Sequence, residues 1–339
     1  MTAGGRLGHS RAVLLMVLAA LLWSIAGVVA RQIESATRFE ITFWRSAFAA
    51  LSLLVILPLW RRSQPRHGDL PAGASRGVGL FVRRHWGLHP EWPAFWISGL
   101  CWSVMFSAFM LAMTFTSVAN VLVIMALGPL FTALLARVTT GLRLPLRTWL
   151  TAVMAGAGIA FMYGSQFAQA LAGPKVDASN LLAGSLIALG VPIGGAINWT
   201  VAQRSQQHGA RIDLVPAVLL GATLSSLALL PLAWPFAASG GDIAWLATLG
   251  LVQLAIPCTL AVISARVLSA PEVSLLALLE VIFGIALVWI GAGEAPGPNV
   301  ITGGGAVIVA LAINEALGWH SRQGTPRIQT LEARDDPAP

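Results

Sequence analysis

The stretch that decides the fold is Val273–Ile290, VSLLALLEVIFGIALVWI, in which Glu280 is the one charged residue. An apolar run of about 18 residues or more is typical of a helix that crosses a lipid bilayer. A charged side chain at bilayer depth costs about 2.5–3.5 kcal/mol on insertion scales. Chains keep such a residue when it lines a cavity, pairs with another group or carries a proton, so Glu280 is the first candidate for a functional residue.

The composition indicates that the whole chain, and not only this stretch, lies in a membrane. Hydrophobic residues make up 56% of the 339 residues and charged residues only 10%, whereas soluble domains carry about 25% charged residues. The net charge of +7 comes from arginines scattered between apolar runs, with Lys175 as the only lysine, so we expect no nucleic-acid partner. Cys101 and Cys258 lack metal or redox spacing. We therefore expect no metal site and no cofactor.

The apolar runs predict an all-α polytopic membrane protein with ten spans. Breaks at charges, polar loops and Pro/Gly clusters place the spans at residues 12–30, 39–60, 92–112, 117–138, 149–167, 180–202, 214–236, 243–266, 273–290 and 300–317. The domain boundaries follow: an N-terminal tail at 1–11, five spans within 12–170, five more within 180–317, and a C-terminal tail at 318–339. A long loop interrupts the first set at 61–91.

The distribution of basic residues predicts the orientation of these spans. Seventeen arginines fall in the two tails and in every second loop, and only Arg31, Arg38 and Lys175 fall on the opposite side. Because cytoplasmic loops carry the excess of Arg and Lys, both termini are expected in the cytoplasm of a cell with a bacterial-type inner membrane.

Two of the predicted spans resemble each other. Asn120–Phe131 aligns without gaps over Glu272–Phe283 at an offset of 152 residues. Each half then contains five spans, and because five is odd the second half starts on the opposite side of the membrane. We therefore predict an inverted 5+5 repeat, an architecture that places a ligand site near the midplane between the halves.

An ordered set of short motifs resembles the EamA-type carriers of the drug/metabolite transporter superfamily. The motifs are Leu22-Trp23-Ser24, Arg45 with Ala47 and Ala49, Gly128-Pro129, Asn198-Trp199-Thr200, Leu279-Glu280 and Gly293-Glu294. The chain departs from the family pattern at Leu142, where a glutamate is expected, and at Val281, where a proline is expected. The resemblance implies ten helices in two halves and the export or exchange of small metabolites, often linked to protons.

Charged and polar residues within the spans are the candidate site residues. Ala277, Glu280 and Gly284 would share one helix face, and a low dielectric penalises the charged carboxylate, which suits proton binding and release at Glu280; the alternative is a structural carboxyl. Arg45 could bind an anionic substrate, pair with an acid or reach the headgroups. Substrate contacts or ordinary interhelical hydrogen bonds are both open for Asn120, Asn198 and Gln253.

Aromatic residues and prolines complete the predicted site. Trp23, Trp102 and Trp199 are candidate cavity walls, although tryptophan is equally common at membrane interfaces. Pro129, Pro192 and Pro257 fall within spans, where each removes a helical hydrogen bond and favours a kink or hinge. Glu272, just after Pro271, reads as a residue that begins a helix.

The favoured function is a secondary transporter that moves a small organic metabolite or drug by alternating access between the repeats. Its expected partners are the small-molecule substrate, the lipid bilayer and, as a candidate coupling ion, the proton; a homodimer stays open. No Walker-type sequence is present to bind ATP. A scaffold or assembly subunit without transport is the alternative. An enzyme is disfavoured because all six histidines fall outside the predicted spans.

Overall fold

A computed structural model describes residues 7–29, 32–63, 92–116, 118–141, 144–172, 178–207, 213–292 and 297–323. Within these ranges the chain is helical and contains no β-strand. Most of the predicted loop 61–91, the ends of both tails and the Gly293-Glu294 motif lie outside the described residues.

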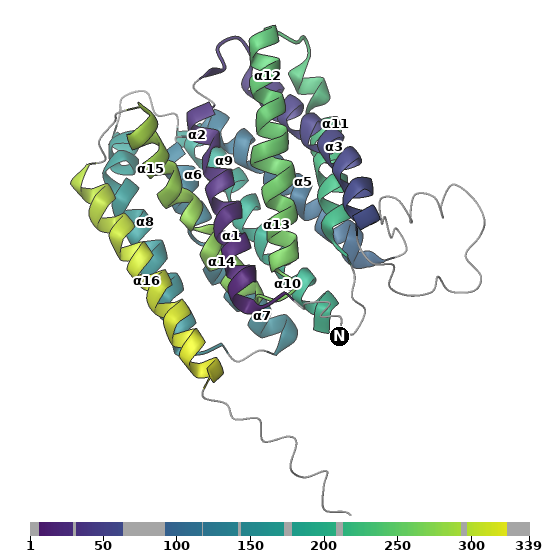
Figure 1. Ribbon diagram of the computed structural model, residues 1–339. Helices are drawn as coiled ribbons and strands as arrows, with labels where there is room; N and C mark the ends of the chain where they lie inside the picture. Colours follow the sequence, from purple (N-terminus) through teal and green to yellow (C-terminus); the bar gives the residue numbers. More distant parts are fainter. Residues whose placement is uncertain are drawn as a thin grey trace, which may run out of the picture.

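The helices form an upright bundle (Figure 1). In chain order they are α1 (His9–Ser24), α2 (Ala26–Val29), α3 (Arg38–Ser63), α5 (Pro93–Phe115), α6 (Val118–Met125), α7 (Gly128–Thr140), α8 (Leu146–Ala172), α9 (Ala178–Ala188), α10 (Gly190–Gln207), α11 (Val215–Ala233), α12 (Gly240–Thr248), η2 (Leu249–Ala255), α13 (Ile256–Ser264), α14 (Ala270–Ala277), α15 (Leu279–Ala292) and α16 (Pro298–Gln323).

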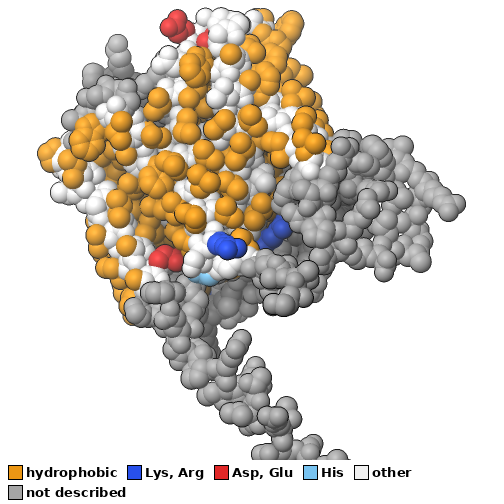
Figure 2. Space-filling model, in the orientation of Figure 1, with side chains coloured by type: hydrophobic (Ala, Val, Ile, Leu, Met, Phe, Trp, Pro, Cys, Tyr) orange, Lys and Arg blue, Asp and Glu red, His pale blue; other side chains and the backbone are white. Residues whose placement is uncertain are grey.

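The helices confirm a polytopic membrane protein. Eight helical segments are long and apolar enough to cross a membrane, and two shorter apolar helices, His9–Ser24 and Leu146–Met162, accompany them. Figure 2 shows why such a surface suits lipid: hydrophobic side chains cover the face in view, and its few charged side chains lie toward the upper and lower margins. In water this apolar surface would remain exposed, whereas lipid tails solvate it.

Four of the helical segments are interrupted, each within its apolar run. The interruptions fall at Ile25, at Ala126–Leu127, at Leu189 and at Leu278. At Leu278 the chain switches to tighter hydrogen bonds, because the Leu278 N–H donates to Leu275 O and the Val281 N–H to Leu278 O, both at 3.1 Å. This break therefore forms without the proline that the family pattern places at Val281.

The three candidate hinge prolines each lie beside a change in helical hydrogen bonding. Pro129 is the second residue of α7, and Pro192 lies three residues after the break at Leu189. Pro257 follows η2, a π-helical segment that ends where the Ile256 N–H donates to Leu251 O. Since proline has no N–H to donate, it relaxes the regular i→i−4 ladder at each of these places.

Helices from the two halves of the chain pack together throughout the bundle. α11 packs against α3 and α5, α10 against α5 and α7, and α1 against α13 and α15, while α8 and α16 pair at one side (Figure 1). The largest buried cluster correspondingly joins residues of both halves, including Met16, Leu53, Trp102, Val218 and Val273. Neither half therefore forms an independent core.

Close glycine contacts set the spacing of the α8–α16 pair. A Cβ atom added to Gly303 would lie 2.6 Å from the Gly158 carbonyl oxygen and 2.5 Å from Met162 Cγ. Small residues that let two backbones approach are a common basis of helix association in membranes.

We predict that Gly303→Val destabilises the protein because the added methyl groups force these two helices apart. Overpacking of this kind costs about 1–3 kcal/mol, so the thermal unfolding midpoint in detergent should fall by several degrees. Gly305→Val is the matched control, since no atom lies within 4 Å of the Cβ position on Gly305. Equal midpoints for the two variants would contradict the prediction.

Candidate functional site

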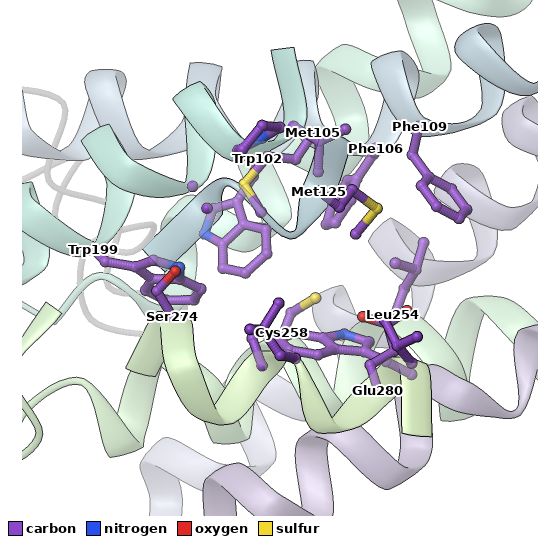
Figure 3. A pocket seen from close by; sticks show the side chains of 18 of the residues that line it. Trp102, Met105, Phe106, Phe109, Met125, Trp199, Leu254, Cys258, Ser274 and Glu280 are labelled. Atoms are coloured by element: carbon purple, nitrogen blue, oxygen red, sulfur yellow. The ribbon is translucent and has the colours of Figure 1, made fainter. Parts of the chain in front are cut away.

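A cavity of about 140 Å³ lies at the centre of the bundle, where the interrupted helices meet α5 (Figure 3). The breaks contribute Met125, Gly128 and Pro129 from α6–α7 and Ser274, Ala277, Leu278, Glu280 and Val281 from α14–α15. α1, α3, α10, η2 and α13 supply further residues, including Trp23, Arg45, Pro192, Trp199, Gln253 and Cys258, and α5 supplies the remainder. A space of this size admits several waters or a small organic group.

Arg45 brings a buried positive charge to the cavity. Its side chain is only 4% exposed, and one Nη donates to the Phe106 carbonyl at 3.3 Å. Among the described residues its Nε has no hydrogen-bond partner. A buried charge with an unused N–H donor is costly unless another group accepts a hydrogen bond from it. Arg45 can therefore bind a hydrogen-bond acceptor that enters the cavity.

Glu280 provides the opposite charge. It is the second residue of α15, directly after the break at Leu278, and a helix N-terminus favours a carboxylate. Glu280 and Arg45 attract each other electrostatically, although no ion pair within 4 Å joins these two described side chains. The cavity therefore lies between two charges that are coupled but not in direct contact.

The break also changes the face that the sequence predicted for Glu280. Ala277 and Glu280 do line the cavity, but Gly284 faces α1, where an added Cβ would be 3.9 Å from Ser24 Cβ. The prediction assumed a continuous helix, whereas α14 ends at Ala277 and α15 begins at Leu279.

Aromatic side chains form the wall opposite Glu280 (Figure 3). Trp102 meets Trp199 edge-on at 5.5 Å between ring centroids and lies 5.4 Å from Phe106. Within the described part of the chain, Trp102 Nε1 and Gln253 Oε1 are buried without partners. The cavity thus offers apolar walls with one unused donor and one unused acceptor besides the two charges.

The cavity brings together eight of the eleven predicted site residues, Trp102 among them. The other seven that line it are Trp23, Arg45, Pro129, Pro192, Trp199, Gln253 and Glu280. Asn120, Asn198 and Pro257 are not among the lining residues. Asn120 donates to Thr116 Oγ1 at 3.0 Å and to Ser185 Oγ at 2.7 Å, and Asn198 accepts from Ser98 Oγ at 2.6 Å. For these two asparagines the geometry fits the alternative of interhelical hydrogen bonds.

Several lining residues were not proposed from the sequence. On α5, Met105, Phe106 and Phe109 continue the wall that Trp102 begins. They follow Trp102 by three, four and seven residues, a spacing from which the sequence could have predicted one shared helix face. Cys258 and Ser274 carried no such signal, because small residues inside apolar runs are ordinary packing residues. No group of three or more potential metal ligands occurs among the described residues.

The fold and the cavity define a class: a polytopic helical membrane protein with a charged central cavity. Residues 10–164 match the model of the EamA-like transporter family, which confirms the predicted resemblance over this part of the chain. Because the matched family consists of transporters, the match is consistent with the prediction that this chain is not an enzyme.

Solved structures share the fold. Twenty-eight solved chains match, among them one described only as the crystal structure of a protein, with a TM-score of 0.68 and 19% sequence identity over 91% of this chain and 99% of that one. This likeness shows the fold alone. No functionally curated protein matches the chain.

We predict that Asn198 and Ser98 act as a structural pair. Asn198→Ala and Ser98→Ala should each lower the unfolding midpoint, because each leaves a buried polar partner unsatisfied. The double variant should lose less than the sum, with a coupling of about 0.6–2 kcal/mol. Thermal unfolding of the four proteins in one detergent gives this coupling, and strictly additive losses would argue against the pair.

Proposed function

We propose that this protein is a secondary transporter that moves a small organic metabolite or drug through the central cavity, with Glu280 as its proton-binding residue. The observation that carries the proposal is the position of Glu280: it follows a helix break, lines the cavity and faces the charge of Arg45 without a direct ion pair. A carboxyl placed in this way can exchange a proton for an interaction with substrate.

Ten spans in an inverted 5+5 repeat form part of the proposal. The breaks support it, because Ala126 and Leu278 are separated by the same 152 residues that align the two sequences. At this offset Gly128 corresponds to Glu280 and Pro129 to Val281, and all four residues line the cavity. Broken helices in corresponding positions of two repeats are typical of substrate sites in secondary transporters.

The proposed cycle uses the charges in turn. When Glu280 is ionised it attracts Arg45; when it binds a proton that attraction is lost, and the guanidinium is released for an anionic or polar group of the substrate. The changes in helical hydrogen bonding beside Pro129, Pro192 and Pro257 are the proposed hinges through which the cavity opens alternately to each side. Trp23, Trp102, Trp199 and Gln253 are the proposed substrate contacts, since flat apolar walls with a few hydrogen-bonding groups suit small organic ligands.

The test is substrate-dependent proton flux in proteoliposomes that contain a pH dye. The panel consists of amino acids, nucleosides, sugars and cationic drugs. We expect Glu280→Gln to abolish the proton signal, because an amide keeps the shape of the carboxyl but cannot exchange a proton. Glu315→Gln is the matched control. Glu315 lies on α16, with 3.6 Å between its Oε2 and His9 Nε2, and is not among the cavity-lining residues.

The outcomes separate the possibilities. Proton flux that persists in Glu280→Gln would make Glu280 a structural carboxyl. If no compound moves protons, radiolabelled exchange of the same panel distinguishes transport without protons from a protein that does not transport.

The proposed orientation has both termini in the cytoplasm of a bacterial-type inner membrane. It is supported by the arginine distribution. The two proposed halves of five spans also add to an even total, which places both termini on the same side. Green fluorescent protein fused to the C-terminus should therefore fluoresce, whereas alkaline phosphatase at the same place should be inactive. Active phosphatase and a dark fluorescent protein would reverse the orientation.

A further inference from the structure

Two helices begin with the same capping arrangement at one end of the bundle. At the start of α3, the Glu40 N–H donates to Thr37 Oγ1 at 3.3 Å, and Glu40 Oε2 accepts from the Thr37 N–H at 3.4 Å. At the start of α12, Ser239 and Asp242 form the equivalent pair, at 3.1 and 3.0 Å. These are capping boxes, which satisfy the free N–H groups of a helix start.

Each capping carboxylate also binds the segment in front of the other helix. The Glu40 oxygens accept from the Ala237 and Ala238 N–H groups, both at 2.9 Å. Reciprocally, the Asp242 oxygens accept from the Glu34 N–H at 3.1 Å and the Ser35 N–H at 3.2 Å. We call the Glu40 and Asp242 carboxylates, together with the four N–H groups that reach them from distant segments of the same chain, the carboxylate clasp.

The two carboxylates of the clasp are buried although they join two loops. Glu40 is 0% exposed and Asp242 is 3% exposed. Phe236, next to Ala237, stacks on Phe43 and packs against Trp44, with 5.2 Å between ring centroids in each case. Hydrogen bonds from N–H groups to carboxylates are the stronger kind, and burial removes the water that would replace them.

Farther along the chain, α3 is in close contact with η2, which continues directly from α12. A Cβ atom on Gly250 would lie 2.5 Å from Phe48 Cβ, 2.8 Å from the Ala49 nitrogen and 2.8 Å from the Arg45 carbonyl oxygen. Two of these atoms belong to the backbone and cannot rotate away. Gly250 therefore fixes the distance between the helices at the level of Arg45.

The clasp and Gly250 hold two of the cavity residues in place. Arg45 lies five residues after Glu40 on α3, and Gln253 lies three residues after Gly250 on η2; both line the cavity. Glu280 reaches the cavity from α15, on the far side of the break at Leu278. The side of the cavity that carries Arg45 and Gln253 therefore belongs to elements that are joined at two places. The side that carries Glu280 belongs to an interrupted helix.

We propose that α3, α12 and η2 move as one rigid unit, held by Glu40, Asp242 and Gly250, and that access to the cavity changes through movement of the α14–α15 segment toward and away from this unit. The inference rests on the proposed transport function for its consequence, but the rigidity itself does not. The competing possibility is that the clasp is a gate that opens in every cycle.

Hydrogen exchange of the full chain in lipid nanodiscs tests the rigidity without any substrate. In a rigid unit, peptides that cover residues 32–37 and 234–239 exchange on the order of 100-fold more slowly than unprotected loop amides. Glu40→Gln and Asp242→Asn should each accelerate exchange in both segments, because the clasp is reciprocal. Glu315→Gln should leave both unchanged. Near-unprotected exchange in the unaltered protein would overturn the proposal.

A reversible crosslink tests the consequence for transport. The Ser35 and Ser239 N–H groups bind the same Asp242 Oδ2, so the two residues are near neighbours, and Ser35→Cys with Ser239→Cys is the pair chosen for oxidation. The probe is proton flux with the compound panel, measured on the oxidised and then the reduced form of one sample. We expect rates within about twofold of each other, since a rigid unit loses nothing when it is locked.

Loss of flux on oxidation with recovery on reduction would overturn the proposal in favour of a gate. If the unaltered protein moves no compound, in the proton assay or by radiolabelled exchange, the proposed transport function fails, and hydrogen exchange still decides whether the unit is rigid.

Discussion

The constraint on which the rest of this structure depends is the lack of water in the bilayer core. Every backbone N–H and C=O group there needs a partner within the protein, which is why the described chain is built from helices. The same constraint makes each interruption of a helix expensive. The breaks at Ala126–Leu127 and Leu278 are tolerated because they border a cavity and because i→i+3 hydrogen bonds replace part of the lost ladder.

The cavity carries polar groups for which the surrounding protein offers few partners. Arg45, Trp102 and Gln253 are almost fully buried, yet each retains an atom without a hydrogen bond among the described residues. A protein under selection for stability alone would pair or replace such groups. Their persistence beside Glu280 is what makes a binding function the best physical account of this site.

Stability in the membrane relies on close contact between helices, since lipid tails are as apolar as leucine and provide no hydrophobic drive for helices to associate. Gly158 with Gly303 brings α8 and α16 together, and Gly250 brings η2 against α3. At the starts of α3 and α12 the contacts are hydrogen bonds instead: the Glu40 and Asp242 carboxylates join two loops that are distant in sequence by accepting from their backbone N–H groups. Together these contacts distribute rigidity unevenly around the cavity, so that some walls are fixed and others are built on breaks.

The sequence by itself determined the membrane class, the approximate helix limits and the candidate residues Glu280 and Arg45, because apolar length and isolated charges are local properties. The capping boxes at Thr37–Glu40 and Ser239–Asp242 were also readable, but not their reciprocal partners some 200 residues away. Only the tertiary structure decided that Asn120 and Asn198 bind neighbouring helices, that Gly284 lies beside α1, and that Cys258 and Ser274 line the cavity. These outcomes depend on how helices rotate and where they break, and in an apolar helix many rotations look alike in sequence until the neighbouring helices select one.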